Sequence, residues 1–266
     1  MRRYHLFEIH DQPWCPRAVR DAMTDYLAFS LRVGNHYAAA VPWLERALLA
    51  CGTNQVTDLC SGGAGPWPTL LPTLNAGRKS AVTVCLTDKY PNVDALGRAS
   101  ISGGLTFSPM SVDATDVPGE FGGVRTIFTA FHHFTPEQAR AVLRDAVRQG
   151  RGVCVFEATQ RSAIAIIATL FSPLLVLLTM PLIRPFRLSR LVLTYLVPVV
   201  PVATLFDGIV SCLRTSTPQE LRTLVADPHF AHYEWHVGEA RTKSPIPMTY
   251  LVGYPAQVGI GSPPAH

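Results

Sequence analysis

Strand-like and helix-like segments alternate regularly between residues 55 and 157, and this alternation constrains the fold more than any other feature. Five apolar, β-rich runs are predicted strands: residues 55–60, 81–87, 105–112, 124–130 and 152–157. Residues 136–149 carry a helical apolar period between the last two runs. Such alternation is typical of parallel strands joined by crossover helices, so the sequence predicts a doubly wound α/β sheet.

The flanking segments complete the predicted fold. Residues 16–50 have the apolar spacing of two helices that precede the first strand. After residue 157, an apolar stretch broken by prolines leads to a helix that begins at Thr217-Pro218-Gln219-Glu220, an N-cap followed by proline. Two strands then follow in succession, residues 232–237 and 248–254. We therefore expect a seven-stranded, mostly parallel sheet with an antiparallel final strand.

A glycine-rich turn follows the first predicted strand and is the strongest indication of a ligand site. The segment reads Asp58-Leu59-Cys60-Ser61-Gly62-Gly63-Ala64-Gly65. Glycines at a strand end allow the backbone to approach a nucleotide-like ligand closely. The second strand ends at Asp88, whose carboxylate can accept hydrogen bonds from two ribose hydroxyls, and the third ends at Asp113, where an adenine amino group can donate.

These motifs resemble those of class I S-adenosylmethionine (SAM)-dependent methyltransferases, over roughly residues 50–255. The first motif of that family, D-L-G-C-G-T-G, corresponds to residues 58–64, with Cys60 in place of the first glycine and Ala64 in place of the third. The resemblance implies SAM as the cofactor, with Gly62 and Gly63 under its methionine part. It assigns the amino end of SAM to Asp58, the ribose to Asp88 and the adenine to Asp113. Cys60, Gly65, Ala114 and Ala130 complete the implied cofactor site.

The resemblance also implies a division of one methyltransferase domain, residues 1–255. Its parts are an N-terminal helical lid (1–52), a SAM-binding core (53–161), an apolar helical insertion between strands five and six (162–215), and the last helix with the strand pair (216–255). Residues 256–266 are expected to be a flexible tail. His10, Asp11, Trp14, Arg17 and Tyr37 are candidates for closing the lid over the cofactor.

Two histidines, His132 and His133, follow the fourth strand and are the catalytic candidates. An imidazole titrates near neutral pH and can remove a proton from a hydroxyl acceptor. A histidine at this place can equally contact the cofactor or cap the helix that begins near Thr135. Glu157, at the end of the fifth strand, and Arg161 are an acid and a base at the rim of the predicted active site, and a mutual ion pair is the plainer interpretation of the two.

The apolar insertion allows three interpretations: a cap over an apolar acceptor pocket, a surface that rests on a membrane, or a hairpin that spans one. Pro173 and Pro181 interrupt its first half, and a spanning hairpin would leave Arg184, Arg187 and Arg190 on the far side. We therefore favour a cap or a membrane-resting surface with the arginines near phosphate head groups. A homodimer interface would use the same residues.

The composition limits which classes of partner and cofactor are expected. The 266 residues carry a formal net charge of +4, but the basic residues form no run, so nucleic acid is not an expected partner. The six cysteines lack metal-like spacing with histidine, and we expect reduced thiols and no bound metal. Acidic residues interrupt any apolar stretch near the N-terminus, so no signal peptide is indicated and the cytoplasm is expected, with peripheral contact to the inner membrane face.

The expected function is methyl transfer from SAM to oxygen, nitrogen or carbon of a small lipophilic acceptor. Three alternatives stay open. The first is a membrane-associated protein that binds SAM without transferring the methyl group. The second uses the sulfonium for another reaction, such as cyclisation. The third is a nicotinamide-dependent oxidoreductase, which also uses a glycine turn and an acid after the second strand, although the G-x-G-x-x-G spacing is absent here.

Overall fold

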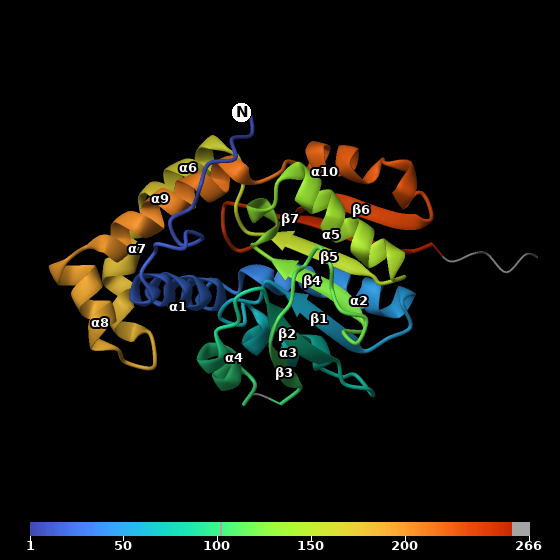
Figure 1. Cartoon of the computed structure of the whole chain (residues 1–266), viewed down its shortest axis with the longest axis horizontal. Coiled ribbons are helices and arrows are strands. Elements are labelled where there is room, and N and C mark those ends of the chain that lie inside the picture. The colour runs from blue at the N-terminus through green and yellow to red at the C-terminus, as the bar shows by residue number, and fades with distance from the viewer. Residues whose placement is uncertain (102, 257–266) are drawn as a thin grey trace, which may run out of the picture.

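The computed structural model describes residues 1–101 and 103–256 and is built around one seven-stranded sheet (Figure 1). The strand order is β3-β2-β1-β4-β5-β7-β6, and β7 runs antiparallel to both of its neighbours. The strands are β1 (Gln55–Leu59), β2 (Thr83–Asp88), β3 (Leu105–Ser111), β4 (Val124–Phe128), β5 (Val153–Glu157), β6 (Tyr233–Ala240) and β7 (Met248–Pro255). The predicted fold class is confirmed. All of the predicted tail except Ala256 lies outside the described residues.

Helices precede the sheet and cross between its strands. They are α1 (Arg17–Val33), η1 (His36–Ala40), α2 (Val41–Ala50), α3 (Trp67–Asn75), α4 (Val93–Ala99), η2 (Phe131–His133), α5 (Pro136–Arg148), α10 (Pro218–Val225) and η5 (Pro228–Phe230). Thr135 and Thr217 each begin a helix with a reciprocal capping box, which satisfies backbone N–H groups that the first turn leaves free. The predicted helix start at Thr217 is therefore confirmed.

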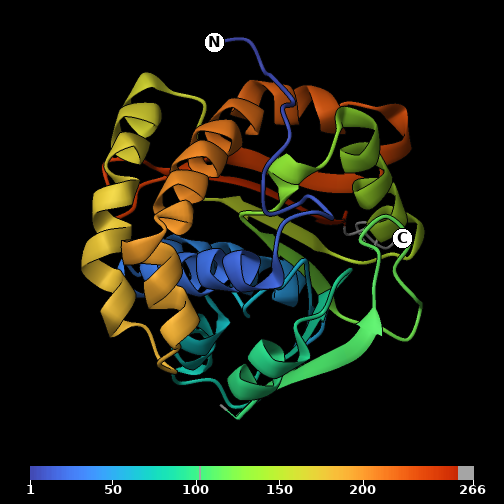
Figure 2. The same cartoon turned by 60° about the vertical axis from the view of Figure 1, so that its left-hand side comes forward.

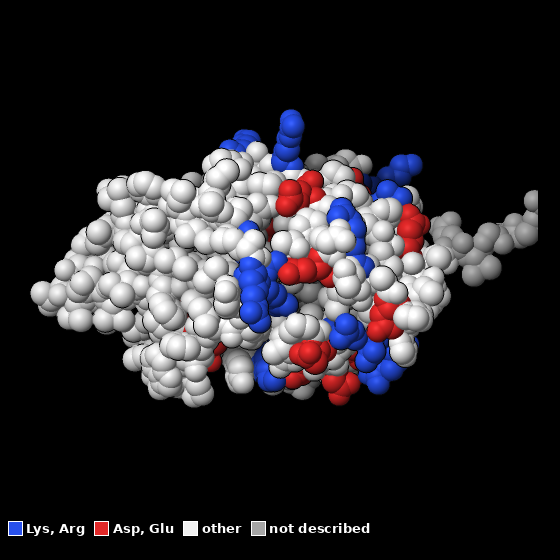
Figure 3. Space-filling model, turned by 90° about the horizontal axis from the view of Figure 1, so that it is seen from above, with Lys and Arg blue, Asp and Glu red and all other residues white. Residues whose placement is uncertain are grey.

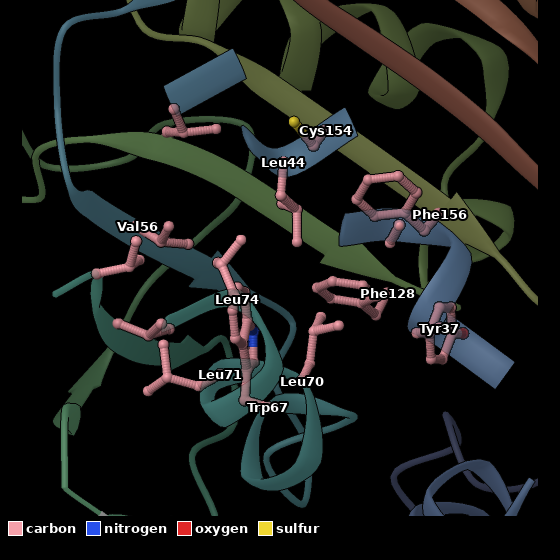
Figure 4. Close-up of a cluster of buried hydrophobic side chains, with 14 of the residues drawn as sticks. Tyr37, Leu44, Val56, Trp67, Leu70, Leu71, Leu74, Phe128, Cys154 and Phe156 are labelled. Carbon is pink, nitrogen blue, oxygen red and sulfur yellow. The ribbon is translucent and has the colours of Figure 1, made fainter. Parts of the chain in front are cut away.

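Two apolar clusters cover the two faces of the sheet. Figure 4 shows the first, in which Leu44 of α2 and Leu70 and Leu74 of α3 pack against strand residues. Phe128 and Phe156 stack within this cluster with ring centroids 5.2 Å apart. The second cluster places α5 and α10 on the opposite face. The central strands β4 and β5 are buried along their whole length, and β1 is buried except at Gln55, whereas the edge strand β3 is largely exposed.

The apolar insertion forms a helical body beside the sheet, in yellow and orange at the left of Figure 1. Its elements are α6 (Ala163–Leu170), α7 (Ser172–Thr179), η3 (Met180–Leu182), α8 (Leu188–Leu191), η4 (Val192–Leu196) and α9 (Val199–Arg214). Prolines divide it as expected, since Pro173, Pro181 and Pro198 each lie at or beside a helix start. Helix α9 packs against α6, α7 and α1, so the body joins the N-terminal helix rather than standing apart (Figure 2).

The outer surface of the insertion is apolar and exposed. Figure 3 shows this side of the molecule almost without charged side chains, in contrast to the mixed charges over the sheet. The large apolar residues that are at least half exposed here are Ile164, Ile167, Leu170, Phe171, Leu174, Leu178, Leu182, Phe186, Leu188, Tyr195, Leu196 and Val202. A patch of this extent is unusual on a monomeric protein surface and marks an interaction site.

In the described chain, no single helix is both long and apolar enough to cross a bilayer. Two bent helix pairs meet that length and composition test together, with bends of 42° and 78°.

One arginine of the insertion is not where the sequence suggested. Arg190 is buried, and its guanidinium donates to Asp25 of α1 at 2.6 Å and to the carbonyl oxygens of Ile183 and Pro185 at 2.6 and 2.7 Å. Its expected place near phosphate head groups is therefore wrong. The physical reason is that a buried charge requires a partner, and Asp25 supplies one from a helix distant in sequence.

Candidate active site

The glycine turn after β1 holds a left-handed backbone at four positions. Two are glycines, Gly62 at φ 52° and Gly65 at φ 49°. The other two are Cys60 at φ 58° and Ala64 at φ 74°, which are the residues that replace glycines of the family motif. A side chain in this region costs roughly 1 kcal/mol or more. The turn therefore keeps the backbone shape of a glycine motif despite both substitutions.

Asp88 at the end of β2 is bound to this turn. One oxygen of its carboxylate accepts the N–H of Gly62 at 2.8 Å, and the other accepts the N–H of Tyr90 at 2.8 Å. The carboxylate is thus fixed at the carboxyl edge of the sheet, directly beside the turn. Two acceptor positions per oxygen leave capacity for further donors.

Asp58 is buried under the turn. Its two carboxylate oxygens accept hydrogen bonds from the hydroxyls of Ser61 and Thr126, both at 2.6 Å. Burial raises the pKa of Asp58 to about 6, and these hydroxyls limit the rise. The structure thus shows Asp58 bracing the turn from below, while its implied contact with the amino end of SAM stays a prediction.

The third acid, Asp113, lies just beyond β3 and already has partners. Its carboxylate accepts from Lys89 Nζ at 2.7 Å and from the backbone and hydroxyl of Thr115. These bonds, with Lys89 the largest cause, lower the pKa of Asp113 to about 2. The methyl groups of Ala114 and Ala130 are buried in the apolar cluster under α5, so these two residues offer backbone rather than side chain to a cofactor.

Helix α1 covers the glycine turn. A Cβ at Gly63 would lie 3.2 Å from the Thr24 methyl group and 3.7 Å from Ala28. Of the other lid candidates, Trp14 is exposed, whereas Tyr37 is buried and its hydroxyl contacts Thr129 Oγ1. Cavities of about 310 and 460 Å³ lie elsewhere, one beside α8 and one beside β6.

The two catalytic candidates lie in a cluster of titratable groups. His132 is buried, and its Nδ1 lies 2.8 Å from Glu157 Oε2. Burial lowers the pKa of His132, but the carboxylates of Glu157 and Glu8 together outweigh burial, so the pKa is raised. The predicted Glu157–Arg161 ion pair is wrong: Glu157 binds His132, and Arg161 pairs with Glu220 at 2.6 Å. The helix of Glu220 brings a nearer carboxylate to that arginine.

Several members of this cluster were not predicted from the sequence. The N-terminal segment passes along the end of α9 and over η2 (Figure 2), and brings Glu8, His10 and Asp11 to the histidines. Asp207 and Arg214 come from α9. His133 Nδ1 lies 2.9 Å from Asp11, and His10 Nδ1 lies 3.0 Å from Asp207. One signal was present, because Asp207 is the lone charged residue between Arg190 and Arg214.

No family model matches the sequence, and no curated protein does. Among solved structures, the chain is similar to the O-methyltransferase NcsB1 from neocarzinostatin biosynthesis, in complex with SAM and 2-hydroxy-5-methyl naphthoic acid. The two share 18% identity with a TM-score of 0.51, over 90% of this chain and 59% of that one. The pyocyanin biosynthetic protein PhzM is less similar, with 14% identity and a TM-score of 0.48 over 85% of this chain and 56% of that one. The methyltransferase domain of bacterial CtHen1 shows 13% identity and a TM-score of 0.48 over 81% of this chain and 97% of that one.

The likeness to NcsB1 shows that the two proteins share a fold, which in this chain is the seven-stranded, mostly parallel sheet with an antiparallel β7. The present chain spans about 59% of the length of NcsB1.

Proposed function

We propose that this protein transfers a methyl group from SAM to a small lipophilic acceptor. The main support for the proposal is the backbone conformation of the glycine turn and its hydrogen bond to Asp88. Cys60, Gly62 and Ala64 hold the left-handed backbone that the glycine motif requires, and the Gly62 N–H is bound by the Asp88 carboxylate that would receive the ribose. The SAM complex of NcsB1, on the same fold, supports this assignment.

Methyl transfer from a sulfonium is an in-line displacement, so the enzyme chiefly aligns the acceptor with the methyl group. When the acceptor is a hydroxyl, its proton must leave as well. His132 and His133 follow β4 at the same edge of the sheet as the turn, and each has its Nδ1 on a carboxylate. These histidines are the groups that we assign to activating the acceptor.

The apolar surface of the insertion supports a lipophilic acceptor and peripheral membrane contact. Most of its large apolar side chains face outward, so they favour a surface that rests on a bilayer over a cap that encloses a pocket. The anchored Arg190 opposes a spanning hairpin, because its guanidinium is tied to α1.

The apolar surface can be tested with the double variant Leu178→Ser, Leu196→Ser. We expect the full chain to sediment with vesicles of mixed neutral and anionic lipid, and the variant to lose most of that binding. Replacement of exposed residues over the sheet, Leu49→Ser and Tyr90→Ser, should leave it unchanged. A stable dimer in solution that fails to bind vesicles would assign the surface to self-association instead.

The cofactor proposal is tested by calorimetric titration with S-adenosylhomocysteine. We expect micromolar binding, weakened about 100-fold by Asp88→Ala, because a hydrogen bond to a charged group is worth about 1.5–3 kcal/mol. Glu45→Ala, an exposed acid on α2, is the matched control and should bind like the wild type. Unchanged affinity in a folded Asp88→Ala variant would contradict the assignment.

A SAM-binding protein without transfer activity is the second candidate, favoured by the substitutions at Cys60 and Ala64. Tight S-adenosylhomocysteine binding without turnover on a panel of lipophilic acceptors would support it, and product analysis would detect a reaction other than methylation. The nicotinamide oxidoreductase alternative is not favoured by the antiparallel β7. Titration with NADH is its direct test.

A further inference from the structure

Glu8 is fully buried in the cluster above η2, yet its carboxylate is only half satisfied. Oε1 accepts a hydrogen bond from Ser211 at 3.1 Å, whereas Oε2 has no hydrogen-bond partner among the described residues. Oε1 lies 3.7 Å from His132 Nε2, and Oε2 lies 3.7 Å from His133 Nδ1. Arg214 Nη1 lies 3.4 Å from Oε1. A buried carboxylate oxygen without a hydrogen-bond partner is costly, so Oε2 favours a further positive charge among these groups.

The separations suit an ion held between these groups. The donor atoms of Glu8, His132 and His133 lie within 4.8 Å of one another. A distance of 3.7 Å is too long for a hydrogen bond. It is close to the roughly 3.4 Å that separates two ligands of a tetrahedral ion with bonds of about 2.1 Å.

The outer contacts fit the same interpretation. Glu157 holds Nδ1 of His132, which leaves Nε2 directed at Glu8, and carboxylate–histidine pairs of this kind orient metal-binding imidazoles. Charge favours a cation too. The histidines His10, His132 and His133 are surrounded by four carboxylates, those of Glu8, Asp11, Glu157 and Asp207. Among the described residues, the guanidinium in contact with these carboxylates is that of Arg214.

We infer that Glu8, His132 and His133 bind a divalent transition-metal ion such as Zn²⁺, with Asp11 able to add a further oxygen. Imidazole nitrogens favour such ions over Mg²⁺ or Ca²⁺, which prefer sites of oxygen ligands. The sequence led to the opposite expectation because it shows no metal-like spacing. The inference rests on the proposed function for its role: a bound ion would supply Lewis-acid chemistry toward an acceptor oxygen, and His132 and His133 would then act as its ligands.

The test is calorimetric titration of the full chain with Zn²⁺ after chelator treatment and dialysis, without SAM. We expect one ion per chain, bound at least 100-fold more weakly by Glu8→Gln, which keeps the size of the side chain and an acceptor for Ser211. Glu157→Gln should weaken binding about tenfold through the orientation of His132. Glu45→Gln and His229→Asn, both at exposed positions, are the matched controls.

A second measurement needs no variant. Co²⁺ bound at the site should give two paramagnetically shifted, exchangeable imidazole N–H signals in proton NMR, one from each histidine. Failure of the folded wild type to bind Zn²⁺ and Co²⁺, fewer than two such signals, or unchanged Zn²⁺ affinity in folded Glu8→Gln would each overturn the proposal. S-Adenosylhomocysteine titration of the metal-free protein tests the cofactor site separately.

Discussion

The two halves of the carboxyl edge of the sheet hold their charges in opposite ways. On the β1–β3 side, each of the three acids has donors from its own neighbourhood: hydroxyls for Asp58, backbone N–H groups for Asp88, and Lys89 for Asp113. On the β4–β5 side, four carboxylates crowd around histidines with one guanidinium among them. The first half is internally satisfied, and the second requires protons or a cation.

This difference in how the acids are paired indicates how each half of the edge would respond to a bound ligand. The β1–β3 side is prepared before any ligand arrives, because its backbone and acids already hold one another in place. The β4–β5 side gains stability when a positive charge enters. Changes in charge should therefore affect the two halves by different amounts.

The largest effect is expected from Arg214→Met in the metal-free protein. Removal of this guanidinium leaves Glu8 and Asp11 without their nearest permanent cation, and breaking a buried pair costs about 3–5 kcal/mol. Urea denaturation, which gives the free energy of unfolding, measures this loss of stability. Arg241→Met, at an exposed position, should change stability by less than about 0.5 kcal/mol. Equal effects of the two substitutions would remove the contrast between the halves.

The next largest effect is expected at Asp58, as a pH dependence of the free energy of unfolding. Its folded pKa of about 6 exceeds the ordinary 3.8, so the native state holds its proton more tightly. The contribution to stability is present below pH 3.8 and is lost as the pH rises through about 6. Relative to Asp58→Asn, the wild type should lose about 3 kcal/mol over this range, at about 1.4 kcal/mol per tenfold change in proton affinity. A difference that stays flat with pH would contradict the buried carboxyl.

A smaller effect is expected in the turn. Gly62→Ala and Gly52→Ala both place a side chain at positive φ without a clash, since the Thr24 methyl group lies 4.0 Å from a Cβ at Gly62 and nothing lies within 4 Å of one at Gly52. Each substitution should therefore cost about 1 kcal/mol of stability. Gly52 lies before the amino end of β1, far from the proposed cofactor. S-Adenosylhomocysteine titration should therefore detect weaker binding in Gly62→Ala only. Equal affinities would show that the ligand does not approach the turn.

The smallest effect belongs to Lys89→Met. The Lys89–Asp113 pair is exposed, so its loss should change stability by less than about 1 kcal/mol. The pKa of Asp113, about 2 with Lys89 present, should rise toward its ordinary value, which NMR titration of the carboxyl carbon can follow. An unchanged pKa would show that the Thr115 bonds alone account for it.

The predictable part of the site is local in sequence. Asp58, Asp88 and Asp113 each lie at a strand end, and parallel strands place such ends at one edge of the sheet, so a one-dimensional pattern sufficed. The backbone at Cys60 and Ala64 was not predictable, because neither residue favours positive φ by itself. The surrounding fold imposes that conformation.

The β4–β5 cluster escaped prediction because it joins three distant segments. Glu8 meets Ser211 and Arg214 across some 200 residues of sequence, and no period or spacing encodes such a contact. The same reason explains Arg190, whose partner Asp25 lies 165 residues away. A lone charge within an apolar segment, as at Asp207, indicates that a partner exists without identifying it.

Two adjacent residues of α1 face different neighbours. Thr24 lies over Gly63, and Asp25 holds Arg190 at the base of α8. Helix α1 therefore connects the insertion to the cover of the glycine turn. We expect access to the proposed cofactor site to depend on what the insertion contacts.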